Sequence, residues 1–456
     1  MADQEDQEPF GIKSVISDLK IVLKYRELLI LIFAVFVSMI GFGLVMPFLP
    51  IYASEFGASK TQIGLMLGVF SIVKIVVAPL GGKLADTYGR KPIMVGGMFV
   101  YMIVMALFGM ARTLPELFIY RGSQGAASAL VWPVAMTYIG DIVKEEDRGK
   151  AMGLYSMSFA SGNAFGPLLG GLIATWYSLS VPFFFTSGLA ATSGILLFFG
   201  VRESYAGSKH EESETKDEDS LSIIDAGPTA QSSGIGYILK APVRFFMTIW
   251  NYIKMITPFP KLFLGLTVGS FTVFFGLSMV WSMLSLFGKE ILLFSDLHIS
   301  LIFTLIGVVQ VIIMFPAGSL SDRIGRKKLI LAGVSLSAVF SGLIGLSTGF
   351  FFLMAAVGFY TFGRALARPS FPALVSSLSS MKHRGKMMGV YNFAQNAAFA
   401  TGSFIGGGVA DLLGLRWPFF VAMIVGLGGS VFIWLTVKEP DKASLKELDD
   451  MDRIED

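Results

Sequence analysis

The chain has 456 residues, of which 54% are hydrophobic and only 15% are charged, and its mean hydropathy is +0.67. About a quarter of the residues in soluble globular proteins are charged, so this composition indicates an integral membrane protein. Long continuous apolar runs favour helices over the short alternating strands of a barrel. The formal net charge of +3 does not favour a nucleic-acid partner, and the absence of cysteine excludes disulfides and thiolate metal sites.

Apolar windows between charged or turn-rich breaks predict twelve membrane-spanning helices. We expect them near residues 29–52, 61–81, 92–111, 115–140, 151–174, 181–200, 262–288, 299–318, 329–347, 350–377, 388–411 and 417–436. The predicted fold is therefore an all-α integral membrane fold of two six-helix bundles.

The spans also divide the chain into five predicted parts. These are an N-terminal segment (1–28), a first bundle (29–200), a linker (201–261), a second bundle (262–436) and a tail (437–456). The acidic stretch 211–220 is typical of a solvated linker. Residues 10–26 and 237–256 mix basic and aromatic side chains, which predicts amphipathic helices lying on the membrane surface.

The placement of Lys and Arg predicts the orientation. Of 36 such residues, 28 lie in the two chain ends and in the loops on the same side of the predicted spans. Because cytoplasmic loops carry the excess of Lys and Arg, we expect both termini to be cytoplasmic and the protein to lie in the cell membrane.

The sequence repeats itself with a shift of 236 residues. The segment G-x-L-A-D-x-x-G-R-K, from Gly82 to Lys91, recurs as G-x-L-S-D-x-x-G-R-K from Gly318 to Lys327, and 318 minus 82 is 236. Each half has an even number of predicted spans, so both halves have the same orientation. Their symmetry axis is then expected along the membrane normal.

These two segments resemble the loop signature that follows the second helix in the major facilitator superfamily. The whole chain most closely resembles the twelve-helix drug:proton antiporter branch of that family. The resemblance implies two pseudo-symmetric six-helix bundles and a carboxylate partner for Arg90 at Asp141. We expect Asp86, Arg90 and Asp141 to form a latch that closes the inner ends of the halves in the outward-facing state. Plain cytoplasmic anchoring by basic residues is the alternative.

The second half has Ser377 at the position equivalent to Asp141, which predicts an asymmetric latch. The candidate gating residues are Gly82, Asp86, Gly89, Arg90, Lys91, Asp141, Gly318, Asp322, Gly325 and Arg326.

The predicted fifth helix resembles the G-x-x-x-G-P-x-x-G-G signature that this family associates with exporters. Small residues four apart let two helices approach closely, and a proline bends a helix because it lacks the backbone donor. Ordinary helix packing is the alternative. The candidate bending residues are Gly162, Gly166, Pro167, Gly170 and Gly171, together with Pro47 and Pro50 of the first helix.

Polar residues inside the predicted spans are basic or neutral, because none of the 33 carboxylates falls in the middle of a span. This departs from many cation exporters of the family. Arg121 and Gln124 resemble the R-x-x-Q-G signature of the fourth helix. An arginine inside a span costs about 2.5–3.5 kcal/mol, so it is a functional candidate, with a structural bond to backbone carbonyls as the alternative. The candidate substrate or proton residues are Lys74, Arg121, Gln124, Asn163, Gln310, Arg364, Arg368, Asn392, Gln395 and Asn396.

Lys74 and Gln310 are equivalent in the repeat. A lysine that cycles between its charged and neutral forms could couple transport to protons without a carboxylate. Lys74 could instead reach the membrane surface or bridge carbonyls.

The leading functional hypothesis is a secondary transporter that works by alternating access and exports lipophilic or amphiphilic compounds with the proton gradient, as in multidrug efflux. A facilitator or proton-coupled carrier of an organic anion is the alternative, favoured by the buried cations. A non-transporting membrane sensor or scaffold is the alternative from another class. No nucleotide-binding loop, catalytic pair or metal-ligand spacing is present, so we expect no enzyme, cofactor or metal. The expected partners are a small-molecule substrate, protons and lipid, and a monomer suffices.

Overall fold

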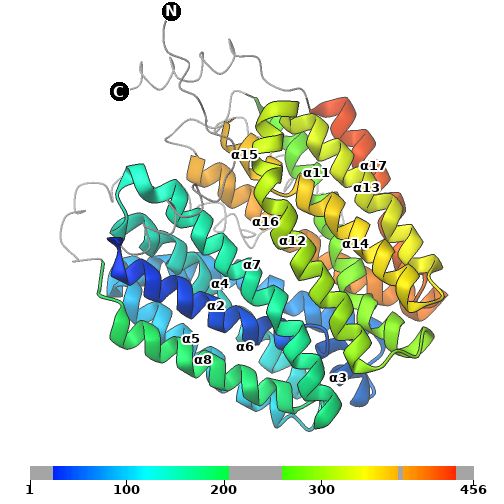
Figure 1. The fold of residues 1–456 in the computed structure, drawn as a ribbon, viewed down its shortest axis with the longest axis horizontal. Helices are drawn as coiled ribbons and strands as arrows, with labels where there is room; N and C mark the ends of the chain where they lie inside the picture. Colours follow the sequence, from blue (N-terminus) through cyan, green and yellow to red (C-terminus); the bar gives the residue numbers. More distant parts are fainter. Residues whose placement is uncertain (1–23, 205–258, 378–383, 438–456) are drawn as a thin grey trace, which may run out of the picture.

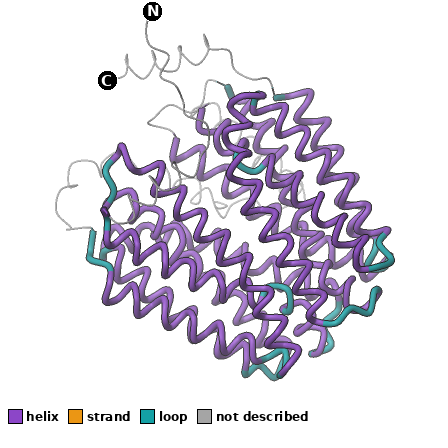
Figure 2. Tube along the Cα trace, viewed as in Figure 1, coloured by secondary structure: helices purple, strands orange, loops and turns teal. Residues whose placement is uncertain are grey.

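The computed structural model describes residues 24–204, 259–377 and 384–437, and this part of the chain is helical apart from short turns (Figure 2). Twelve of its helices have 18 residues or more. They are α2 (Arg26–Val45), α4 (Lys60–Tyr88), α5 (Arg90–Gly109), α6 (Leu114–Ile142), α7 (Glu145–Trp176), α8 (Val181–Gly200), α11 (Pro260–Leu286), α12 (Asp296–Ile324), α13 (Arg326–Leu346), α14 (Phe350–Ala367), α16 (Arg384–Leu413) and α17 (Trp417–Thr436). The predicted surface helices at 10–26 and 237–256, the acidic stretch and the tail beyond 437 lie outside the described residues, apart from 24–26.

Two predicted spans are each broken into two helices. The first span consists of α2 and the short α3 (Leu49–Glu55), and the tenth consists of α14 and α15 (Ser370–Ser377). Each break contains one proline, Pro47 or Pro369, and a second proline three residues later lies in the first turn of the next helix, Pro50 or Pro372. Two prolines remove two backbone donors from one turn, whereas single prolines such as Pro167 lie inside continuous helices.

The two halves are built by the same helix pairing, and Figure 1 shows them as two bundles, blue to green and green to red. In the first half (α2 to α8), α2 packs against α7, α4 against α6, and α5 against α8. In the second half (α11 to α17), α11 packs against α16, α12 against α14, and α13 against α17. These pairs correspond one to one under the sequence repeat. The pseudo-symmetric fold predicted from the repeat is confirmed.

The bundles have two ends that are useful to name. The terminal end carries Arg26, Gly89, Val201, Gly325 and Val437. The far end carries the turns that follow α3, α5, α7, η2 (Phe287–Ile291), α13 and α16. A helix of about 20 residues spans the roughly 30 Å of membrane hydrocarbon between two such ends.

The halves contact each other mainly through two symmetry-related pairs, α4 with α16 and α7 with α12, and α11 adds smaller contacts with α3 and α4. One hydrophobic cluster joins the first half to the far end of the second half, where it includes Phe287 and Phe419. The terminal end of the second half has a separate cluster around Phe263, Phe371 and Tyr391. Among the described residues, the apolar core is therefore continuous between the halves at the far end.

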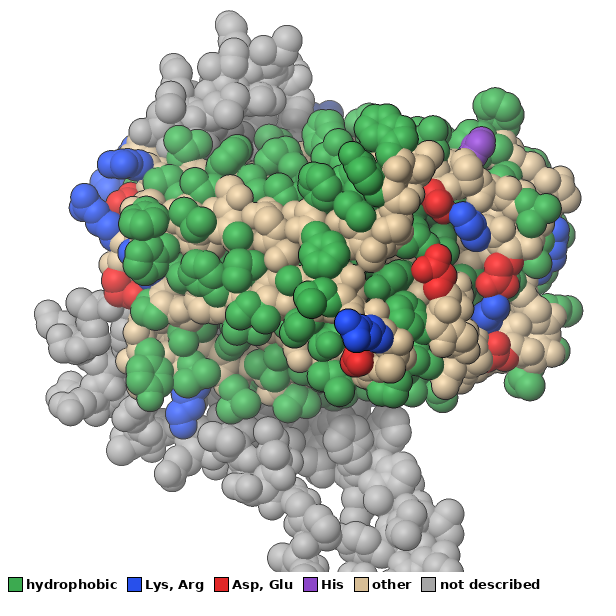
Figure 3. All heavy atoms as spheres, turned by 90° about the horizontal axis from the view of Figure 1, so that it is seen from below, with side chains coloured by type: hydrophobic (Ala, Val, Ile, Leu, Met, Phe, Trp, Pro, Cys, Tyr) green, Lys and Arg blue, Asp and Glu red, His purple; other side chains and the backbone are tan. Residues whose placement is uncertain are grey.

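The surface matches a membrane environment. Figure 3 shows a broad hydrophobic belt, with charged side chains mainly toward the two margins of the view. Large apolar side chains such as Phe199 and Phe351 are more than 80% exposed, at 81% and 84%. Nine segments of the described chain are long and apolar enough to cross a membrane. The three less apolar long helices are α6, α7 and α16, of which α7 and α16 contact the opposite half.

Adjacent glycines let α7 contact both halves. A Cβ on Gly170 would overlap Leu44 on α2 of the same half, whereas a Cβ on Gly171 would overlap Ser300 on α12 of the other half. Hydrogen in place of a side chain therefore permits two close helix contacts at neighbouring positions.

The second half repeats this arrangement on α16. A Cβ on Gly406 would lie 3.2 Å from Met279 Cα on α11, and a Cβ on Gly407 would overlap the carbonyl of Lys60 on α4. In each pair, the first glycine (Gly170 or Gly406) packs within its own bundle, and the second (Gly171 or Gly407) packs against the other bundle.

We predict different consequences for Gly170→Ala and Gly171→Ala. Gly170→Ala should lower the free energy of unfolding of the detergent-solubilised protein by about 1–3 kcal/mol, because the added methyl group would overpack the first half. Gly171→Ala should leave the bundle folded and open the far end, seen as faster labelling of a cysteine placed at Ser300. Gly188→Ala is the control because no atom lies within 4 Å of its added Cβ. Equal stability losses for Gly170→Ala and Gly171→Ala would contradict this division.

Candidate functional site

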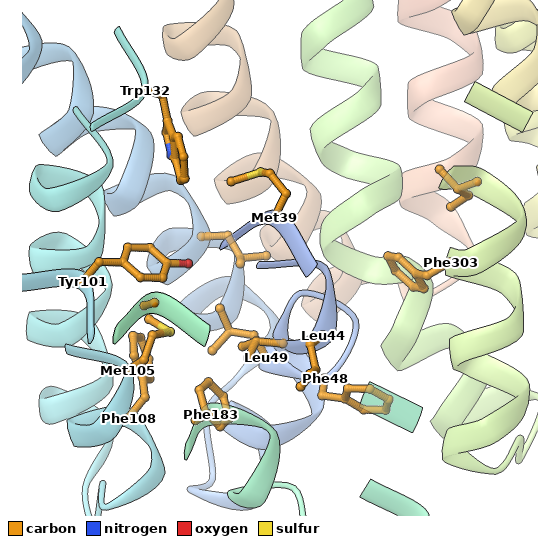
Figure 4. Close-up of a cluster of buried hydrophobic side chains, with 14 of the residues drawn as sticks. Met39, Leu44, Phe48, Leu49, Tyr101, Met105, Phe108, Trp132, Phe183 and Phe303 are labelled. Atoms are coloured by element: carbon orange, nitrogen blue, oxygen red, sulfur yellow. The ribbon is translucent and has the colours of Figure 1, made fainter. Parts of the chain in front are cut away.

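A pocket lies between the halves, near the far end. It is formed by α2, α7, α11 and α12 and is nearly closed in this conformation, with a free volume of about 10 Å³, room for about one water molecule. Its lining includes Met46, Pro47, Asn163, Trp281, Phe303 and Gln310. Three of these, Pro47, Asn163 and Gln310, are among the residues proposed from the sequence. The rest of the lining is mainly apolar, and Figure 4 shows Phe303 on the side of the second half, apart from the cluster of the first half.

Arg121 is the largest fully buried side chain beside this pocket, with only 1% of its surface exposed. Its Nη1 donates to Gln124 Oε1, and Gln124 Nε2 donates to the Tyr101 hydroxyl at 3.1 Å. Its Nη2 lies 3.9 Å from the Met46 sulfur. Met46 also lines the pocket, so one side chain connects the buried cation with the pocket wall.

The guanidinium of Arg121 has no acidic partner among the described residues. Its remaining contact is the face of Phe70, 4.5 Å from the ring centre, and its Nε has no hydrogen-bond partner. An aromatic face compensates a buried cation only in part. The sequence analysis considered an Arg121 that is hydrogen-bonded to backbone carbonyls. In the structure the contacts of its guanidinium are with the side chains of Gln124, Met46 and Phe70.

The other predicted cations lie away from this pocket. Arg364 is half-buried with its guanidinium carbon 5.5 Å from the Tyr360 ring centre, and Arg368 is exposed where α14 ends. Lys74 is half-buried on α4 and forms no ion pair with a described carboxylate, while its repeat equivalent Gln310 lines the pocket.

The polar residues predicted on α16 form their own group. Asn396 Nδ2 donates to the Asn392 carbonyl at 2.8 Å, and Gln395 is half-buried beside them. None of the three lines the pocket. Asn163 and Gln310 therefore line the pocket and Arg121 and Gln124 lie beside it, whereas the other candidate substrate residues lie away from it.

The charged cluster at the terminal end is assembled within the first half. Arg90 pairs with Asp141, and its Nη2 lies 3.7 Å from Asp86 Oδ1. The Glu203 carboxylate accepts the backbone N–H groups of Arg90 at 2.9 Å and Lys91 at 3.2 Å. This acid caps α5, where the positive end of the helix dipole favours it. The cluster therefore ties α4, α5 and α6 to the residues that follow α8.

The second copy of the motif is held differently. Arg326 Nη1 donates to the Ala373 carbonyl of α15 at 3.0 Å. Ser377, at the position equivalent to Asp141, donates to the Leu374 carbonyl of its own helix at 2.9 Å. The backbone of Asp322 belongs to α12, but its side chain lies outside the described part. Gly325 has the same positive φ as Gly89, 103° against 98°, so the turn itself is common to both copies.

Two candidate glycines occupy open positions. A Cβ on Gly82 or Gly318 would meet no atom within 4 Å. Neither of them is needed for a helix contact in this conformation.

A second cluster, the far-end clasp, joins the halves and consists of Lys60, Thr61, Glu290 and Asp411. The Asp411 carboxylate on α16 accepts the N–H groups of Lys60 at 3.0 Å and Thr61 at 2.8 Å, and the Thr61 hydroxyl at 2.6 Å. Lys60 Nζ pairs with Glu290 at 2.7 Å. Asp411 thereby caps α4 of the other half.

The charge of Asp411 is favoured in the clasp. Partial burial raises the pKa of its carboxyl, but hydrogen bonds from Thr61 and from the Lys60 backbone outweigh this, so the pKa lies below its usual range. Sequence patterns did not predict the clasp. The Ser59 capping box marks the start of α4, but the capping acid comes from a helix that lies far away in the chain.

The comparisons with known proteins agree with this fold. The sequence profile described as Major Facilitator Superfamily matches residues 31–287 and 266–452. Multidrug resistance protein 2 of Bacillus subtilis is 26% identical, covering 91% of this chain and 97% of the relative. The quinolone resistance protein NorA of Staphylococcus aureus is 25% identical, covering 92% and 99%.

Solved structures also share the fold. A bacterial homologue of the human lysosomal transporter Spinster, in an inward-facing and occupied conformation, matches with a TM-score of 0.71 at 15% identity, over 90% of this chain and 96% of the other. The human organic anion transporter TETRAN matches with a TM-score of 0.63 at 18% identity, over 90% and 99%. The sequence profile agrees with the internal repeat, the helix pairing and the pocket between the halves. The chain therefore belongs to the major facilitator superfamily, a family of membrane transporters and not of enzymes.

Proposed function

We propose that this transporter exports lipophilic or amphiphilic compounds by alternating access and uses the proton gradient to drive them. The observation that carries the proposal is a pocket between two halves that meet at one end, whose wall combines apolar residues with the amides of Asn163 and Gln310. A site between two pivoting bundles is open to one face of the membrane at a time. The relatives named for multidrug and quinolone resistance support export.

The distribution of Lys and Arg supports a cytoplasmic terminal end in the cell membrane. On this assignment, contact at the far end corresponds to an inward-facing conformation. We expect the cluster of Asp86, Arg90 and Asp141 to face the second half when the terminal ends close, and so to act as a latch in the outward-facing state. A monomer suffices, because one chain carries both halves.

The first prediction concerns transport itself. Purified protein in liposomes should accumulate a lipophilic ion, either 4-butylbenzenesulfonate or 4-butylphenyltrimethylammonium, against its gradient when a pH difference is imposed. A protonophore should abolish accumulation, and protein-free liposomes should show none. Failure to move either ion, with the pH difference in either direction, would favour the sensor or scaffold hypothesis.

The second prediction concerns the far-end clasp. Asp411→Asn should raise the far-end-open population roughly fivefold, because a helix cap contributes about 1 kcal/mol. The chain has no cysteine, so spin labels at introduced Tyr177→Cys and Phe351→Cys report the far-end distance without background. Glu116→Gln is the matched control, because Glu116 accepts its hydrogen bond from Arg112 in the same half.

The pH dependence of the clasp follows from the same carboxylate. Because the pKa of Asp411 is lower in the clasp than after release, the clasp should be at full strength above about pH 5 and weaken as the pH falls below about 4. In the protein that keeps Asp411, the distance between the spin labels at positions 177 and 351 should therefore not change between pH 5 and 8. A large opening within that range would mean that another group controls the far end.

The third prediction concerns proton coupling through Lys74. Lys74→Gln should abolish accumulation driven by the pH difference and leave exchange of substrate between the two sides of the membrane, because glutamine cannot carry the proton. Lys83→Gln is the control, since Lys83 is exposed on the same helix. Unchanged proton-driven transport with an unchanged pH profile in Lys74→Gln would exclude this role.

A further inference from the structure

We infer that the compound carried is an organic anion, and that its acidic group binds in the inter-half pocket beside Met46 and Trp281, where Arg121 supplies the compensating charge. The inference rests on the proposed function and specifies its substrate class. It follows from three properties of the pocket: the sign of the nearest charge, the kind of polar atoms in the wall, and the contact that joins them.

The nearest charge is positive and is not neutralised. Arg121 is buried, its Nε has no partner, and no described carboxylate pairs with it. A charge in a weakly polarisable interior acts over a longer distance than a charge in water. The side chains that do contact the guanidinium, Gln124, Met46 and Phe70, are all neutral.

Among the residues that the structure describes, the wall of the pocket offers hydrogen-bond donors and contains no carboxylate. The Trp281 Nε1–H is buried without a partner, and an indole nitrogen can only donate. Its ring is fixed edge-on against Phe303, with ring centres 5.5 Å apart. Asn163 and Gln310 supply amide donors from the opposite halves. An oxyanion would satisfy the indole, whereas a bound cation would have no acid in this wall to pair with.

Met46 is the link between the wall and the charge. It lies in the break between α2 and α3, lines the pocket, and holds its sulfur 3.9 Å from Arg121 Nη2. A methionine side chain is flexible and adapts its rotamer at small cost. A small rotation of this thioether would bring an anionic group into direct contact with the guanidinium. Phe303, Ile306 and Pro47 line the rest of the pocket, and the apolar body of an amphiphile would lie against them when the two halves move apart enough to widen it.

The experiment uses three probes with the same 4-butylphenyl body. Their head groups are a sulfonate, an uncharged methyl sulfone and a trimethylammonium. Binding of each radiolabelled probe is measured to the full chain in lipid nanodiscs. The sulfonate should bind at least about tenfold more tightly than the ammonium, and the methyl sulfone should lie between them, because about 1.4 kcal/mol corresponds to tenfold.

Two variants locate the anion. Arg121→Gln should weaken sulfonate binding about tenfold and leave methyl sulfone binding within twofold, which also shows that the variant folds. Trp281→Phe keeps an aromatic ring but removes the donor, and should weaken sulfonate binding several-fold. Arg121→Lys should retain most of the preference. Arg112→Gln removes the same unit of charge from an exposed far-end position and should have no effect.

Equal binding of the three head groups would overturn the anion assignment, as would sulfonate binding that survives both Arg121→Gln and Trp281→Phe. Transport of the ammonium probe under a pH difference would in that case leave the exporter proposal standing. A protein that binds the sulfonate selectively but transports neither ion would keep the anion site and contradict export. The two proposals therefore fail by different results.

Discussion

The structure depends on the close approach of helices across the two halves. α7 and α16 each cross a helix of the opposite bundle at a distance that only a glycine permits, at Gly171 and Gly407. A Cβ at Gly171 would overlap the Ser300 side chain of α12, and a Cβ at Gly407 would overlap the Lys60 backbone of α4. The same two helices use the neighbouring glycines, Gly170 and Gly406, to pack within their own bundles. Contact between the halves is thereby separated from the stability of each half, which a pivoting transporter requires.

The two halves share one architecture but differ in their charges. The charged cluster at the terminal end has its acid, Asp141, in the first half, while the second half has Ser377 and its Arg326 donates to a backbone carbonyl. The far-end clasp is one-sided as well, because Asp411 caps α4 and its repeat equivalent Thr175 donates to its own helix at Gly171. The shape is shared because glycines at equivalent positions, Gly170 with Gly406 and Gly171 with Gly407, set the same helix contacts in both halves. The charged residues differ between the halves, with an Arg90–Asp141 pair in the first half and the Asp411 cap contributed by the second.

The interior charge distribution is the most unusual chemical property of the chain. In the part of the chain that the structure describes, the pocket wall contains no carboxylate, and the side chains in contact with the buried Arg121 are neutral. A buried cation without an acidic partner lowers the stability of the fold, so it is a candidate for a functional role. Its position behind Met46, next to a pocket that both halves share, places it where a substrate of opposite sign would relieve the cost.

By itself the sequence determined the membrane class, the twelve spans, the duplication and the motif residues, because hydropathy, periodicity and repeated spacing are local properties of the chain. It also identified Arg121, Gln124, Asn163 and Gln310 as interior polar residues. Only the tertiary structure decided which of them meet: Asn163 and Gln310 share a pocket, whereas Arg364 and Arg368 lie elsewhere. Met46, Trp281, Glu203 and Asp411 could not be predicted, since a methionine or a loop-end acid acquires its role from a partner brought close by packing. The state in which the halves meet at the far end is likewise a property of the folded bundles, because it depends on contacts between residues hundreds of positions apart.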